Sequence, residues 1–327
     1  MKVFIIGGTG FIGYHATLEL LKREHIVSTL SLPDIDLSGW YPDEVLVSHG
    51  NVFEMPENDL ISLFSGHDAL IYAIGPDDRS KVKGSAYEFF HKYLVEECGR
   101  ILAAARKAGI KKCAITGSYF AYFDRLHPEK GLFERHPYIK CRTEQEKRAI
   151  SEGKDTMSVS ILELPYIFGT MPKRVPLWED ILFRRLHDHF IVLYPKGGSN
   201  MIAVESVAEA IAGAIERGEH GTRYLVGDAN LSWVQMIQII LKAMNMEKKP
   251  IITLPCFLAS LYGKWMKTKE NKKGFENGLD LNHIFNDIMC QCLYFDPSST
   301  ANELNYRRGG LEKSINKTVT ASLKNLK

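Results

Sequence analysis

The chain has 327 residues, a formal net charge of +2, 45% hydrophobic residues and 24% charged residues. These values are ordinary for a globular protein, and the near-neutral charge gives no reason to expect a nucleic acid or a membrane surface as partner. No apolar stretch approaches the roughly 20 residues that span a bilayer. The first strand pattern begins at Lys2, so we expect no targeting segment before it.

The six cysteines are scattered, which is not the spacing of a disulfide scaffold. Cys290 and Cys292, like His187 and His189, are too few to indicate a metal site, so no metal is expected. We therefore expect a cytoplasmic protein with reduced cysteines. The basic cluster at residues 267–273 is interpreted as solvated surface.

Strand and helix patterns alternate through the first half of the chain. The strand patterns occupy residues 2–6, 26–31, 45–47, 69–74, 112–117 and 159–164. The helical patterns occupy residues 11–24, 56–65, 85–108 and 138–151. This alternation predicts an α/β fold with a doubly wound parallel sheet, the Rossmann arrangement, and helices on both faces.

The second half is less regular. It predicts a helix over 205–216, a late strand of the same sheet over 223–226, and a helix over 231–244. Apolar helical stretches in residues 250–300 are typical of a smaller, mainly helical C-terminal substrate lobe. We assign 1–165 plus about 201–230 to the Rossmann domain, and about 166–200 plus 231–327 to the substrate-binding lobe.

A glycine-rich turn directly follows the first strand, and a helical pattern follows the turn. One glycine permits the tight turn, one lets the backbone approach phosphates, and one lets helix and strand pack closely. The helix then directs its free N–H groups at the anion. The motif predicts a dinucleotide pyrophosphate site, the alternative being a turn without ligand. Its residues are Gly7, Thr9, Gly10, Phe11, Ile12 and Gly13.

Ligands of such sheets bind beyond the carboxyl ends of the strands. Ser118 follows the fifth strand there, and Tyr138 stands twenty positions later at the start of a helix. With the glycine motif, these residues resemble the extended short-chain dehydrogenase/reductase superfamily, in its NAD-dependent epimerase/dehydratase-like branch. The resemblance implies that Ser118 orients a substrate oxygen, that Tyr138 is the acid/base, and that Arg142 stands at the family's lysine position.

A phenol has an ordinary pKa near 10, so a neighbouring cation must stabilise the phenolate for acid/base work near neutrality. Arg142 lies one helical turn from Tyr138 and is expected to lower the phenol pKa and hold the ribose, although it cannot relay a proton. Lys140, two residues on, is expected to face solvent. The alternative is that Tyr138 only packs and that Ser118 only bonds a loop backbone.

Other aromatic and histidine residues near these positions receive lesser roles. Tyr119 and Tyr122 are interpreted as pocket walls, and His127 and His136 as loop residues.

The resemblance also implies further cofactor contacts, at Ser31, Asn51, Val52, Ala73, Ile74, Gly75, Pro165 and Ile167. The end of the second strand offers neither the acidic residue that selects NAD nor the arginine that selects NADP, so both cofactors stay open. A homodimer through the helices after strands four and five is possible by resemblance.

The substrate lobe carries several large apolar residues, which favour an apolar or aromatic substrate unless they are ordinary lobe core. They are Phe183, Phe257, Leu258, Leu261, Tyr262, Trp265 and Met266. The first hypothesis is an NAD(P)-dependent oxidoreductase of a small-to-medium carbonyl or secondary alcohol. The alternatives are a nucleotide-sugar epimerase or dehydratase, and a non-catalytic dinucleotide-binding sensor or scaffold.

Overall fold

In the computed structural model, which describes residues 1–154 and 156–325, the central sheet has seven parallel strands in the order β11-β7-β6-β4-β1-β2-β3. These strands are β1 (Lys2–Ile6), β2 (Ile26–Ser31), β3 (Leu46–His49), β4 (Ala69–Tyr72), β6 (Lys112–Ser118), β7 (Ser158–Leu164) and β11 (Arg223–Leu225). The predicted doubly wound parallel sheet is confirmed, and the late strand is its edge.

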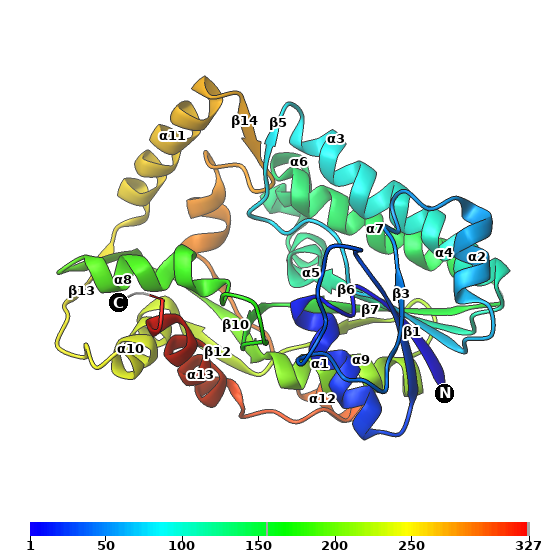
Figure 1. Cartoon of the computed structure of the whole chain (residues 1–327). Coiled ribbons are helices and arrows are strands. Elements are labelled where there is room, and N and C mark those ends of the chain that lie inside the picture. Colours follow the sequence, from blue (N-terminus) through cyan, green and yellow to red (C-terminus); the bar gives the residue numbers. More distant parts are fainter. Residues whose placement is uncertain (155, 326–327) are drawn as a thin grey trace.

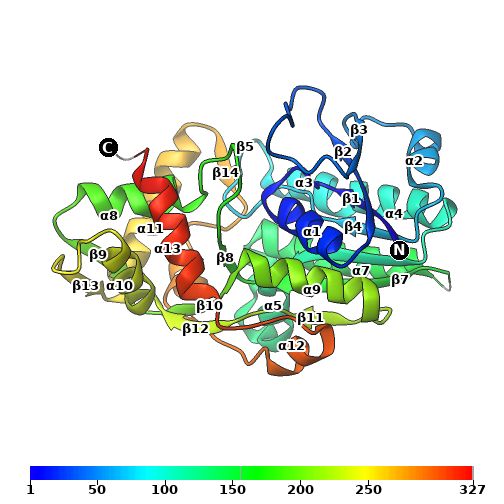
Figure 2. The same cartoon turned by 60° about the horizontal axis from the view of Figure 1, so that its bottom comes forward.

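Helices cover both faces of the sheet (Figures 1 and 2). On one face lie α2 (Glu57–Phe64), α4 (Glu97–Lys107) and α7 (Pro137–Gly153); on the other lie α1 (Phe11–Lys22), α9 (Val204–Arg217) and α12 (Ser298–Leu304). Strand β1 shows why both layers are needed. Val3 and Ile5 pack with α1 and α9, whereas Phe4 and Ile6 pack with α2 and α4. Because side chains alternate along a strand, an uninterrupted apolar run requires helices on each face.

The long helix predicted over 85–108 consists of α3 (Ala86–Phe90), a π-helical segment η1 (His91–Glu96) and α4. It stops before Gly109, whose φ of +93° is the left-handed conformation that a glycine adopts easily after a helix. Leu94 in the π segment packs close to Gly75, just after β4. The irregular turn therefore lies next to the carboxyl edge of the sheet.

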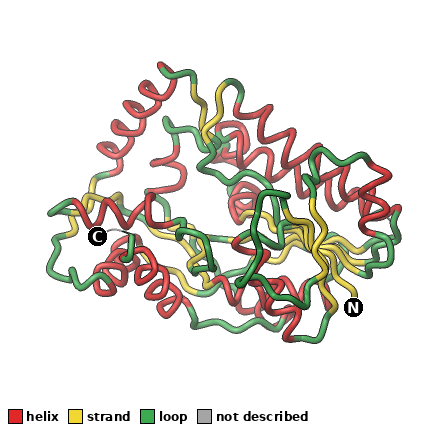
Figure 3. Tube along the Cα trace, viewed as in Figure 1, coloured by secondary structure: helices red, strands yellow, loops and turns green. Residues whose placement is uncertain are grey.

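The second lobe mixes helices with short strands that the sequence did not reveal (Figure 3). Runs of two to six residues are too short for periodicity to identify. The strands are β8 (Tyr166–Phe168), β9 (Val192–Pro195), β10 (Gly198–Ala203), β12 (Ala229–Ser232), β13 (Ile251–Leu254), β14 (Phe275–Asn277) and β15 (Cys292–Leu293). Strand β10 pairs with β8, β12 and β15. The domain boundaries themselves stay predictions.

The helices of this lobe include α8 (Arg184–Asp188), α10 (Trp233–Ala243), α11 (Cys256–Lys272) and α13 (Leu311–Leu323), with π-helical segments η3 (Glu179–Phe183) and η4 (Phe285–Met289). Four shorter elements of the first half remain. Strand β5 (Lys81–Lys83) pairs with β14. Helices α5 (Tyr119–Leu126) and α6 (Leu132–Arg135) follow β6, with the 3-10 turn η2 (Pro128–Lys130) between them.

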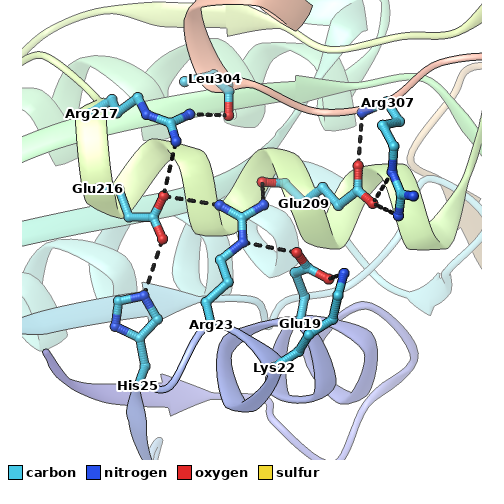
Figure 4. Close-up of polar contacts among 9 residues, drawn as sticks. All are labelled: Glu19, Lys22, Arg23, His25, Glu209, Glu216, Arg217, Leu304 and Arg307. Atoms are coloured by element: carbon cyan, nitrogen blue, oxygen red, sulfur yellow. Dashed lines mark hydrogen bonds and ion pairs between the residues drawn. The ribbon is translucent and has the colours of Figure 1, made fainter.

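A polar cluster joins the end of α1 to α9 on the outer side of the sheet (Figure 4). Arg23 donates to Glu19 at 2.8 Å and to Glu216 at 2.9 Å, and His25 contacts the other oxygen of Glu216 at 3.1 Å. A guanidinium with several partners in a partly buried setting contributes more to stability than an exposed pair does. The cluster therefore fixes the helix that carries the glycine turn.

Arg23→Ala is expected to lower the free energy of unfolding by about 1–3 kcal/mol, because it leaves partly buried carboxylates without their donor. Lys22→Ala is the matched control, since Lys22 shares Glu19 but is 64% exposed, against 19% for Arg23. The control is expected to change stability by no more than about 0.5 kcal/mol. Urea unfolding of both variants provides the measurement, and equal losses would contradict a role of the cluster.

One cysteine expectation is wrong. Cys256 and Cys290 form a disulfide with a Cα–Cα distance of 6.0 Å, which ties the start of α11 to the end of η4. The sequence did not indicate this pair, because the two cysteines are 34 positions apart and only the folded lobe brings them together. Among the described residues, no helix is both long and apolar enough to cross a membrane, and no cluster of potential ligands could hold a metal ion.

Candidate active site

A cavity of about 520 Å³ opens at the carboxyl ends of the central strands. It lies at the switch point of the sheet, where successive strands leave β1 in opposite directions and a crevice must form. The structure brings many predicted residues together in its wall. They are Gly10, Phe11, Ile12, Ala73, Gly75, Ser118, Tyr138, Arg142, Pro165 and Ile167.

The three motif glycines have distinct surroundings. Gly7 has a φ of +86°, and a Cβ there would lie 2.5 Å from the Ala73 carbonyl oxygen. A Cβ on Gly13 would lie 2.0 Å from the Gly7 carbonyl oxygen, so that position holds helix against turn. On Gly10 a Cβ would approach only that same oxygen, at 3.2 Å, and Gly10 lines the cavity.

Helix α1 begins after Gly10 without a side-chain cap. The N–H groups of its first turn therefore point at the cavity edge without an internal acceptor, which is the arrangement that binds phosphate. Together with the open face of Gly10, this turn fits a dinucleotide pyrophosphate.

The remaining predicted cofactor residues lie outside the cavity wall. Thr9 belongs to the glycine turn, and Ile74 packs against Gly7. Ser31 ends β2 and is buried, with its hydroxyl donating to the Leu32 carbonyl at 3.2 Å. Asn51 and Val52 follow β3 at the same edge of the sheet. Their contacts with an adenosine stay predictions, and the end of β2 still distinguishes neither NAD nor NADP.

Tyr138 and Arg142 form a pair at the start of α7. The Arg142 Nε–H donates to the Tyr138 hydroxyl oxygen at 3.0 Å, and both side chains are buried. Because a guanidinium can only donate, the phenol keeps its own proton for another acceptor. Burial raises the pKa of Tyr138; Arg142 acts in the predicted downward direction but does not outweigh burial.

Most of the Arg142 guanidinium is already engaged. Its Nη1 donates to the Thr116 carbonyl at 3.2 Å and to Gln145 Oε1 at 2.8 Å. Across residues 1–154 and 156–325, Nη2 has no hydrogen-bond partner, so it alone is left for a ribose. Lys140 faces solvent only in part, because its Nζ lies over the ring of Tyr87, at 4.3 Å from the centroid.

Ser118 ends β6 and lines the cavity, while its Oγ also accepts a long 3.4 Å hydrogen bond from the Phe120 N–H. The backbone contact and the predicted substrate contact are therefore compatible, because the hydroxyl proton is free. Tyr119 is a cavity wall, with its hydroxyl 2.8 Å from Ser199 Oγ, whereas Tyr122 is not part of the wall.

His136 precedes α7 and is fully buried. It accepts from the Asp280 N–H at 3.0 Å and contacts Asp287 at 3.1 Å. It thus ties the helix that carries Tyr138 to η4, a connection that its loop position in the sequence did not indicate.

The segment after β4 supplies charged groups that sequence reasoning missed. Asp77, Asp78 and Arg79 line the cavity, and Arg79 lies 3.8 Å from Asp78. Burial raises the pKa of Asp78 to about 6, while Arg79 opposes the rise. The available signal was an acidic pair a few residues after the end of a buried strand.

The outer wall of the cavity is mainly apolar and comes from segments far apart in the sequence. It includes Tyr166, Trp178, Ile181, Tyr194, Trp233, Ile284 and Ile288. The predicted apolar set is wrong as a cavity wall: Phe183 lies in the lobe core, Met266 is half-buried, and the other five are exposed on α11. Those five are Phe257, Leu258, Leu261, Tyr262 and Trp265.

A cluster of charged side chains with two buried carboxylates, Glu146 and Glu163, lies outside the cavity wall. Glu163 at the end of β7 accepts from Arg125 of α5 at 2.5 Å, and Glu146 of α7 accepts from Arg125 and Arg223, each at 2.8 Å. Burial, together with the neighbouring Glu146 carboxylate, raises the pKa of Glu163 to about 8, against the effect of Arg125. The cluster joins α5, which directly follows Ser118, to α7, which carries Tyr138.

This elevated pKa predicts a pH-dependent stability. The folded chain holds a proton on Glu163 that the unfolded chain releases, so this stabilisation is full below about pH 4.5 and is lost as the pH rises through about 8. Between pH 5.5 and 8.5 the free energy of unfolding of the natural chain is expected to fall by on the order of 2 kcal/mol more than that of Glu163→Gln. Urea unfolding at each pH provides the measurement. The control is Glu312→Gln, at an exposed position, whose stability should change with pH as that of the natural chain does. If the stability of Glu163→Gln changed with pH in the same way, the raised pKa of Glu163 would be contradicted.

No family model matches the chain. A putative dihydroflavonol 4-reductase of Synechocystis is 25% identical, over 95% of this chain and 92% of that protein. The mouse protein sterol-4-alpha-carboxylate 3-dehydrogenase, decarboxylating, is 23% identical, over 79% of this chain and 72% of that protein.

Two solved structures share the fold over nearly the whole chain. The structure of gox2253 has a TM-score of 0.79 at 18% identity and covers 99% of this chain and 98% of its own. UDP-glucose 4-epimerase from Thermotoga maritima, solved with UDP-glucose, has a TM-score of 0.71 at 15% identity and full coverage of both chains.

Proposed function

We propose that this chain is an NAD(P)-dependent oxidoreductase of the extended short-chain dehydrogenase/reductase superfamily, acting on a carbonyl compound or secondary alcohol. The observation that carries the proposal is the Tyr138–Arg142 pair, which lines the same cavity as the open glycine turn. A proton donor and a phosphate cradle in one cavity suit hydride transfer coupled to proton transfer.

The glycine turn at Gly10 and the first turn of α1 would hold the pyrophosphate, and Arg142 Nη2 would donate to a ribose hydroxyl. When bound, the dinucleotide supplies or accepts the hydride. In the reducing direction Ser118 donates to the substrate oxygen, and Tyr138 transfers its proton to that oxygen as the carbonyl becomes an alcohol. Arg142 stabilises the phenolate that remains, and the reverse reaction returns the proton to Tyr138.

The cavity wall supports an apolar, ring-bearing substrate. Aromatic side chains such as Trp178 and Trp233 supply flat contact area and few fixed charges, so orientation falls to the polar groups around Tyr138. The two curated relatives carry the names of a reductase and a sterol dehydrogenase, which agrees with such a substrate.

Thermal unfolding with NAD, NADP and their reduced forms tests the cofactor first, because a ligand that binds only the folded state must raise the melting temperature. A panel of apolar ketones and alcohols then follows with the preferred form. Net consumption of freely exchanging cofactor supports the proposal. Absence of any stabilisation by all four dinucleotides would overturn it.

A second candidate is a nucleotide-sugar epimerase, because Arg79 and Arg174 line the cavity and could face a diphosphate. NAD that co-purifies and resists dialysis, without net turnover, would favour it. If the natural chain is inactive and Arg142→Lys creates activity, the protein is instead a dinucleotide-binding sensor or scaffold.

A further inference from the structure

Helix α11 carries its large apolar side chains on the outside. Small or polar residues face the protein, namely Ala259, Ser260, Gly263 and Glu270, which are all buried. The outward face presents residues whose exposed fractions lie between 43% and 65%. These are Phe257, Leu258, Leu261, Tyr262 and Trp265. A surface helix of a globular protein normally has the opposite arrangement.

The outward face is fixed in place by contacts on the inward side. A Cβ on Gly263 would lie 2.4 Å from the Leu281 carbonyl oxygen, so the backbones are in close contact there. Lys267 pairs with Asp280 at 3.0 Å, and Glu270 pairs with Lys81 of β5 at 2.8 Å. With the disulfide at its start, α11 is held at both ends. The apolar residues therefore cannot turn inward without breaking these contacts.

On α11 itself the exposed charges are all positive. Lys264, Lys269, Lys272 and Lys273 are exposed and have no ion-pair partner among residues 1–154 and 156–325, while the buried acid Glu270 is already neutralised by Lys81. In Figure 1, α11 projects from the upper part of the molecule, with β5 and β14 beside its far end. Lys83 on β5 adds a further exposed cation there.

We propose that α11 docks this protein on an anionic membrane surface, with its five apolar residues at the headgroup boundary and its lysines on lipid phosphates. Aromatic and leucine residues beside lysines are the composition of an interfacial helix. A second copy fits poorly, because a two-fold contact would place the same lysines near one another. The sequence alone indicated only solvated lysines, since it does not reveal which side of a helix faces outward.

Docking here would place the catalytic cavity next to the membrane. The inward face of α11 packs on η4, and η4 contributes Ile288 and Met289 to the cavity wall. This consequence depends on the proposed function, whereas the docking itself does not.

Flotation of the intact chain with vesicles tests the docking without cofactor or turnover. Vesicles with about 30% phosphatidylserine should bind, and phosphatidylcholine vesicles should bind far less. Each lysine near an anionic surface is worth about fivefold in partitioning, so K264Q/K269Q/K272Q should weaken binding about 100-fold. Raising salt should weaken the natural chain in the same way.

L261E/W265E should abolish flotation, while L46E, at an exposed leucine on β3, should retain it. Far-ultraviolet circular dichroism and thermal unfolding should show all variants folded. Two results would overturn the proposal. One is no flotation of the natural chain with anionic vesicles. The other is a dimer in sedimentation velocity that L261E/W265E dissociates, which would make a second copy the occupant of this face.

Discussion

Tyr138→Phe is expected to lower kcat for the chain's carbonyl substrate by about 10²- to 10⁴-fold, the usual contribution of a positioned acid/base. The variant removes only the hydroxyl, to which Arg142 donates at 3.0 Å. The aromatic ring stays packed against Phe90, at 5.5 Å between centroids, so the cavity keeps its shape. Dinucleotide affinity should therefore change little, and steady-state kinetics with a binding titration would separate the two effects.

Tyr119→Phe is the matched control for this prediction. Tyr119 is a second buried tyrosine of the same cavity, but its hydroxyl contacts Ser199 at 2.8 Å and not a charged group. Losing a neutral hydrogen bond should cost about 1 kcal/mol of stability and leave kcat within about threefold. Equal turnover for the natural chain and Tyr138→Phe would remove Tyr138 from the chemistry. If Tyr138→Phe lowered kcat only as much as Tyr119→Phe does, the Tyr138 hydroxyl would have a packing role and not a chemical one.

The central fold could be predicted because its signals are local. The run at residues 2–6 is apolar at each position after Lys2, which requires helices on both faces. Gly109 ends a long helix where the structure shows a positive φ. The second lobe lacked such signals: its strands gain their hydrogen bonds from partners distant in the chain, as β10 does with β12 and β15.

The residues of the candidate site also fall into two groups, those with a local sequence signal and those whose role depends on neighbours in space. Gly10 follows β1 and Ser118 ends β6, and the carboxyl ends of parallel strands meet at one edge of the sheet. Tyr138 stands at the start of a helix, twenty positions after Ser118. Asp78 was missed because its significance comes from the groups around it in space. Helix α11 was misjudged for a related reason: the spacing of Leu261 and Trp265 shows that they share a face, but not that the face points away from the protein.

Gly10→Ala is expected to weaken dinucleotide binding at least tenfold while leaving the ligand-free chain nearly as stable. The added Cβ would approach only the Gly7 carbonyl oxygen, at 3.2 Å, and would occupy the side on which the pyrophosphate is proposed to lie. Exchange of glycine for alanine before the first helical turn costs about 1 kcal/mol or less. A tenfold loss of affinity removes about 1.4 kcal/mol of ligand stabilisation, which thermal unfolding at fixed dinucleotide concentration detects.

Gly13→Ala separates the binding role of the turn from its packing role. Its Cβ would lie 2.0 Å from the Gly7 carbonyl oxygen, so the helix must move away from the turn. Overpacking of this kind costs about 1–3 kcal/mol, and the loss should appear without any ligand. Gly10→Ala should therefore lose dinucleotide binding, whereas Gly13→Ala, three residues away, should lose stability in the absence of ligand. If dinucleotide stabilised Gly10→Ala as much as the natural chain, the phosphates would have to bind elsewhere. The proposal that this cavity binds the cofactor would then be wrong.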